Sequence, residues 1–333
     1  MNEVLKEHPY VKSIIQLSDA EDDRYVFHQK VAPILVQMGN DKEFLKEVVR
    51  RNLTDEGYLS QTWTLYNIPY FFVYENEHIN IKIHLFPRHE RKLEGIAAHC
   101  IHHHNNYLLT SNAFFGSGYE SMLFEKELNL NEKDLTVSMK IRKHFHQKEW
   151  NPSLVDSWEP HVVFIPEKLS ATLVIWTPDK KRNTDNLRAN PILKAVKGPL
   201  RWAIHAFGLT EKFGIAAKNT YQFYPEKGKS TFKAIEENEY FAPTRAAKGA
   251  EVDEYSMRMI FDFLQQADLV EPEFLKQVRA NTITPAYYYK WLDMVLNNQK
   301  VPEVFHREEI NIPIRAYTRA DIQTAAGLVK ETA

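Results

Sequence analysis

Four histidines lie within the six residues from His99 to His104, and no other part of the sequence is as well suited to chemistry. In an extended strand, alternate side chains share a face and lie ~6.5 Å apart along the chain. His102 and His104 have this spacing, and two imidazoles so placed can converge on one ion with bonds of ~2.1 Å. The other two, His99 and His103, fall on the opposite face and are too far apart along a strand to chelate. The sequence therefore predicts that His102 and His104 bind a divalent transition metal.

A third ligand is expected from a neighbouring strand, because stable sites of this kind use at least three protein ligands. His161 is the candidate, since it opens the apolar run 161–165, and an inward-facing imidazole at the head of such a strand needs a partner. The simpler alternatives are a solvated histidine cluster and a structural histidine that neighbouring groups satisfy. We expect His102, His104 and His161 to form one metal site.

Residues 66–180, which contain these histidines, have the pattern of an antiparallel β structure. Ile79, Ile81 and Ile83 alternate with residues such as Lys82 and His84, which predicts a half-buried strand. Further strand-like runs follow at short spacing, and 116–118 (Gly-Ser-Gly) predicts a hairpin turn between two of them. The predicted strands are 98–104, 107–115, 118–126, 135–146, 160–166 and 171–177. Short strands separated by turns predict an antiparallel barrel or sandwich.

Helical patterns flank this β region on both sides. Apolar residues recur at helical spacing within 1–65, after Asn190-Pro191, and from 251 to 296. The sequence therefore predicts an α+β fold in three parts: an N-terminal helical extension (1–65), a β-barrel with the metal site (66–180), and a mainly helical region (181–333) packed on the barrel. The aromatic residues of 287–291 predict either a cover for the barrel mouth or the face of a homodimer.

Composition narrows the expected partners and compartment. A net charge of −2 disfavours nucleic acid and anionic membranes as partners, because those surfaces attract an excess of Lys and Arg. The single cysteine, Cys100, rules out an intrachain disulfide. The chain begins with charged residues rather than the apolar run of a signal peptide, and no window approaches the ~18 apolar residues of a spanning helix. We therefore expect a cytoplasmic protein.

The histidine strand, the turn at 116–119 and the element 161–163 leading into 170–176 resemble the cupin superfamily, most closely the single-domain branch of cysteine dioxygenase-type enzymes. The resemblance covers about 70–180, under half of the chain. It implies a jelly-roll barrel with His102, His104 and His161 as metal ligands. Leu108 and Leu109 stand where the general cupin motif has a glutamate ligand, which favours a three-histidine site. Such a site suits Fe(II) with open positions for substrate and dioxygen, and Zn(II) or another divalent transition metal also fits.

The sequence departs from that branch in its substrate-binding residues. The Ser-His-Tyr set that follows the third ligand in the family is replaced by Thr172, Val174 and Trp176. The arginine that holds the substrate carboxylate would fall near 71–72, where both residues are Phe, so cysteine is a poor candidate substrate.

Other polar residues are candidates for catalytic or substrate-binding roles. Arg142 and His144 share a face of the predicted strand 135–146; they are candidates if that face lines the barrel and ordinary surface residues if it meets water. The same alternatives apply to Lys82 and His84. Arg88 belongs to a charged segment that is either an anion clamp or a solvated loop.

These observations predict a non-haem Fe(II) dioxygenase, an oxidoreductase that acts on a small polar metabolite with dioxygen as its second substrate. A zinc cupin that acts as a hydrolase, lyase or isomerase is the first alternative. The second is a cupin binding protein without catalytic activity.

Overall fold

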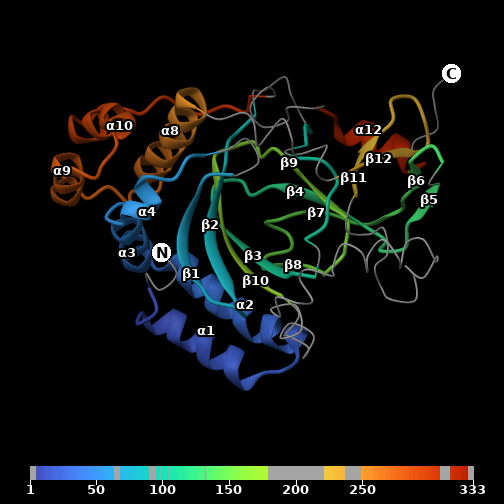
Figure 1. Cartoon of the computed structure of the whole chain (residues 1–333), viewed down its shortest axis with the longest axis horizontal. Coiled ribbons are helices and arrows are strands. Elements are labelled where there is room, and N and C mark those ends of the chain that lie inside the picture. Colours follow the sequence, from blue (N-terminus) through green and yellow to red (C-terminus); the bar gives the residue numbers. More distant parts are fainter. Residues whose placement is uncertain are drawn as a thin grey trace, which may run out of the picture.

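The computed structural model describes residues 5–63, 68–89, 95–97, 99–104, 106–131, 133–178, 221–236, 249–307 and 316–328. Within these ranges the fold is α+β, with antiparallel sheets in the middle and helices at both ends (Figure 1). This confirms the predicted class and the helical ends. The helix predicted from Asn190-Pro191 lies outside the described residues.

Four helices precede the first strand. They are α1 (Pro9–Ala20), α2 (Arg24–Asn40), α3 (Lys42–Asn52) and α4 (Glu56–Leu59). Asp23, Asp41 and Asp55 set the starts of the last three, because each carboxylate accepts a hydrogen bond from a backbone N–H of the first turn. The apolar stripes of α2 and α3 pack against the five-stranded sheet, α1 packs on α2, and all of them contribute to one core.

The strands of the described residues form three antiparallel sheets. The largest has the order β1 (Tyr70–Glu75), β2 (Asn80–Phe86), β10 (Ser170–Thr177), β3 (Leu108–Phe115), β8 (Ser153–Val155). A second sheet has the order β7 (Ile141–His146), β4 (Glu120–Phe124), β9 (His161–Phe164). The third has the order β11 (Tyr221–Pro225), β12 (Phe232–Glu236), β6 (Thr136–Ser138), β5 (Asn129–Asn131).

The hydrogen bonds of the described residues leave these sheets open, and this arrangement is compatible with a β-sandwich rather than showing a closed barrel. The predicted strand 98–104 is present only as isolated bridges, in which His102 pairs with His161 and Ile101 pairs with Phe223. The predicted strand 135–146 is divided into β6 and β7, which belong to different sheets. The segment around His102 thereby links the β9 sheet to the β11 sheet.

The two faces of β2 have different neighbours. Ile81, Ile83 and Leu85 belong to the large hydrophobic core that the sheet shares with the helices. Lys82 and His84 point the other way and line a cavity. The apolar residues of the predicted strand therefore lie in the core as expected, whereas its polar residues face the cavity inside the β structure rather than bulk solvent.

The C-terminal helices extend the core on the same face of the five-stranded sheet as the N-terminal ones, with the first of them on β2 and the others packed on it in turn. They are α8 (Ala250–Gln266), α9 (Pro272–Ala280) and α10 (Ala286–Leu296), while the short α12 (Arg319–Ala325) lies at the other end of the molecule (Figure 1). Residues of α1–α4, of the sheet and of α8–α10 form one continuous core. Both helical regions are thus parts of one packed structure around the sheet.

The aromatic residues of α10 belong to this core. Tyr288 and Trp291 are buried within the helical layer, and no residue of α10 lines the cavity described below. The helix therefore does not cover that cavity, and the homodimer face stays a prediction. No helix in the described ranges is long and apolar enough to cross a membrane.

Candidate metal centre

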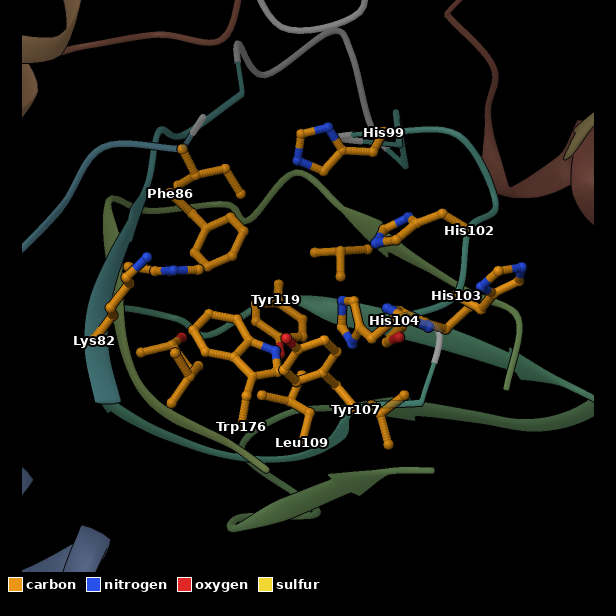
Figure 2. Close-up of a pocket in the computed structure, with 18 of the residues that line it drawn as sticks. Lys82, Phe86, His99, His102, His103, His104, Tyr107, Leu109, Tyr119 and Trp176 are labelled. Atoms are coloured by element: carbon orange, nitrogen blue, oxygen red, sulfur yellow. The ribbon is translucent and has the colours of Figure 1, made fainter. Parts of the chain in front are cut away.

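A cavity of about 440 Å³ lies between the five-stranded sheet and the β9 sheet. The first sheet lines it from β2, β3 and β10, and the second from β4, β7 and β9. Residues 99–104 close one side, where four histidines gather (Figure 2). This volume lies within the ~300–1,000 Å³ range of small-molecule pockets.

The imidazoles of His102, His104 and His161 meet at one wall of this cavity. One ring nitrogen of each lies within 4.8 Å of the others, and the ring centroids are 4.3 to 5.3 Å apart. A tetrahedral ion with bonds of ~2.1 Å separates its ligand atoms by about 3.4 Å. Small rotations of the rings are therefore enough to bring the three nitrogens to a common ion.

Backbone pairing holds two of these residues opposite each other. His102 N donates to His161 O at 3.0 Å, and His161 N donates to His102 O at 2.7 Å. Residues that exchange both hydrogen bonds in an antiparallel pair project their side chains to the same face. His161 also pairs with Leu123 of β4, which fixes the register of β9.

In His102 and His161 a backbone hydrogen bond engages Nδ1 and leaves Nε2 free. His102 Nδ1 donates to the carbonyl of Cys100 and His161 Nδ1 donates to the carbonyl of Glu159, each at 3.0 Å. A proton on Nδ1 leaves the Nε2 lone pair free for a metal, and a backbone carbonyl is a common partner of metal-binding imidazoles. His104 Nδ1 is buried and has no hydrogen-bond partner. Together these contacts fit a metal ion, because they leave an unpaired nitrogen on every ring.

Burial keeps the three imidazoles neutral. Loss of hydration is the largest cause, and it lowers the pKa of His102 from 6.5 to about 4. The pKa values of His104 and His161 fall well below 6.5 through burial and the proximity of the neighbouring histidines. A neutral imidazole is the form that binds a metal.

Two further histidines line the same cavity, although the sequence placed them on the opposite face of a strand. His99 lies with its ring centroid 6.0 Å from that of His102, and burial lowers its pKa to about 3. His103 also lines the cavity, and its ring contacts Trp158. The alternation rule fails here because 99–104 is not a continuous strand.

A buried polar network that sequence patterns did not reveal adjoins the cavity, and two of its members, Tyr119 and Thr172, line the cavity. Ser111 Oγ lies 2.8 Å from Ser153 Oγ and 3.3 Å from the Tyr119 hydroxyl, and it accepts from Gln147 Nε2 at 3.2 Å. Thr172 Oγ1 donates to Gln147 Oε1 at 3.4 Å. These side chains are almost fully buried, so their mutual hydrogen bonds replace those to water. No local sequence signal identifies such a network, because its members come from separate strands.

Arg142 and His144 are not brought to the histidines. They project from the face of β7 opposite Phe145, and of these three residues only Phe145 lines the cavity. Arg142 Nε donates to Glu159 Oε1 at 2.7 Å, while His144 and Arg319 both contact the Glu120 carboxylate. Of the two alternatives for this face, the structure supports the one in which these side chains lie outside the cavity.

No family model matches the chain, and no curated protein matches it.

Proposed function

We propose that the chain is a cupin-type metal enzyme, and specifically a non-haem Fe(II) dioxygenase that acts on a small polar metabolite. The observation that carries this proposal is the set of three neutral imidazoles at the cavity wall, each with a nitrogen that no protein group uses. Three histidine ligands without a carboxylate leave coordination positions for substrate and dioxygen.

The arrangement of the strands supports the cupin part of the proposal. A jelly-roll barrel consists of two facing antiparallel sheets, and here two such sheets enclose the cavity with the histidines on one wall. The ligands come from two separate β segments, as the resemblance implies. We propose that these sheets are the two halves of a cupin barrel.

The residues that line the cavity suit it to oxidative chemistry because they exclude water and can orient a substrate. Fe(II) bound at the histidines supplies the redox chemistry with dioxygen. Phe86, Phe145 and Trp176 line the cavity with apolar rings that exclude water from the reacting groups. Tyr119, Ser121 and Thr172 also line the cavity and offer hydroxyl groups that orient the polar atoms of a bound metabolite.

Nitric oxide, a stable substitute for dioxygen, tests the proposal without a known substrate. We expect the Fe(II)-loaded protein to give the electron paramagnetic resonance signal of a ferrous nitrosyl, and His161→Ala to give none. Oxygen uptake in the presence of candidate metabolites then identifies turnover. A protein that retains zinc, rejects Fe(II) and gives no nitrosyl signal would refute the dioxygenase and favour a zinc cupin. A protein that binds its ligand equally well without any metal would favour the binding protein.

A further inference from the structure

The cavity has an uneven distribution of charge. Lys82, on β2, is the single Lys or Arg among the described residues that line it, and none of those residues is an Asp or Glu. The described lining of the site therefore contains one ammonium group and no carboxylate.

Lys82 has no anionic partner in the part of the chain that the structure describes. Its Nζ lies 4.4 Å from the centroid of the Tyr70 ring, and it forms no ion pair within 4.0 Å. Burial lowers the pKa of Lys82, and the charge of Glu75, at the end of β1, opposes this effect without lining the cavity. A partly buried ammonium without a counter-ion is costly, and a bound anion would remove that cost.

The other cations that the sequence offered for this role are paired elsewhere. Arg88 forms an ion pair with Glu303 and lies over the ring of Phe305. Arg142 pairs with Glu159 on the outer face of β7. Neither arginine lines the cavity.

We propose that Lys82 binds the anionic end of the substrate, which is therefore a small organic anion with a flat apolar body. This inference rests on the proposed function, because it assigns the substrate class of the same site. Figure 2 shows Lys82 across the cavity from His102 and His104, with Trp176 and Tyr119 between them. A molecule held at Lys82 by its carboxylate thus extends past aromatic rings toward the metal wall.

The same charge distribution excludes other ligands. The ammonium of an α-amino acid would find no carboxylate in this cavity, so a zwitterion would bury an unpaired charge. The aromatic walls favour a ring or a planar chain as the body of the molecule, since apolar surface gains from burial against them.

Calorimetric titration of the full-length, metal-free protein tests this assignment. The probes are benzoate, phenylacetate and 3-phenylpropionate, which carry the carboxylate at increasing distance from the ring, with benzamide and benzylamine as neutral and cationic controls. We expect at least one carboxylate to bind and benzylamine not to bind. Lys82→Met should weaken binding of that carboxylate about 10- to 100-fold, the factor expected for a lost hydrogen bond to a charged group. Lys82→Arg should restore part of it, and Lys276→Met, which removes a charge from the exposed face of α9, should change nothing.

The result separates this inference from the proposed function. Failure of all three carboxylates to bind, or equal affinity in wild type and Lys82→Met, would overturn the role of Lys82 even if the protein binds iron. Selective, Lys82-dependent binding to a protein that takes up no metal would support the anion site and count against the dioxygenase.

Discussion

His28 should make the stability of the protein depend on pH in a way that the structure quantifies. It is buried in α2, with Nδ1 2.7 Å from Thr110 Oγ1 and Nε2 2.8 Å from Thr177 Oγ1. The imidazole therefore ties α2 to β3 and to the end of β10. Burial, with a smaller contribution from the charge of Arg24, lowers the pKa of His28 from 6.5 to about 3.

The sign follows from this lowered pKa. Between pH 6.5 and pH 3 the unfolded chain binds a proton at His28 and the folded chain does not, so falling pH favours the unfolded state. The contribution of His28 to stability is complete above pH 6.5 and is lost as pH falls toward 3. With these two pKa values, the loss between pH 7 and pH 5 is about 2 kcal/mol.

The assay compares wild type with His28→Gln, whose amide can donate and accept hydrogen bonds but does not titrate. Urea unfolding of the metal-free proteins gives the free energy of unfolding at pH 7 and at pH 5. We expect the stability advantage of wild type over His28→Gln to shrink by about 2 kcal/mol at the lower pH. His78→Gln, in the turn between β1 and β2, is the control and should show no such change. An advantage that is equal at both pH values would refute the reasoning.

Two further predictions concern the turn before β4 and the outer face of β7. Gly116 has a φ of +79°, and a Cβ there would lie 2.0 Å from the Leu169 carbonyl oxygen. Gly116→Ala should therefore lower the free energy of unfolding, measured in urea, clearly more than Gly228→Ala. Gly228 has a φ of +69° with open space around it, so its substitution should cost only ~1–2 kcal/mol. Equal losses in the two variants would contradict the close packing of Gly116 against Leu169. Arg142→Ala and His144→Ala should retain the metal content of wild type, as measured by elemental analysis, because both side chains project away from the cavity; loss of metal in either would place that residue at the site.

The sequence predicted what local patterns determine. Period-two alternation located β2, because a strand with one face in a core repeats every second residue, and strand-like runs at short spacing located β3, β4, β9 and β10. The pair His102 and His104 followed from the same period, and His161 followed from the cost of burying an imidazole at the head of an apolar strand. The structure brings these three side chains together.

The features that the sequence could not predict depend on which strand faces are covered by elements distant in the sequence. The sequence shows that Lys82 and His84 lie on a polar strand face, but no local pattern tells whether that face meets water or lines a cavity, as it does here. The same ambiguity applied to Arg142, whose face is the outer one. The irregular path of 99–104, which places His99 in the cavity, is set by bridges to β9 and β11, and those partners lie far away in the sequence.

The metal content of purified protein tests the central claim most directly. Elemental analysis should find about one transition-metal ion for each wild-type chain, and His161→Ala should lose it. His103→Ala is the matched control, because His103 lies in the same segment but its ring contacts Trp158 and its side chain is outside the three-histidine group. Circular dichroism establishes that each variant is folded. Retention of the metal by a folded His161→Ala protein would contradict the account.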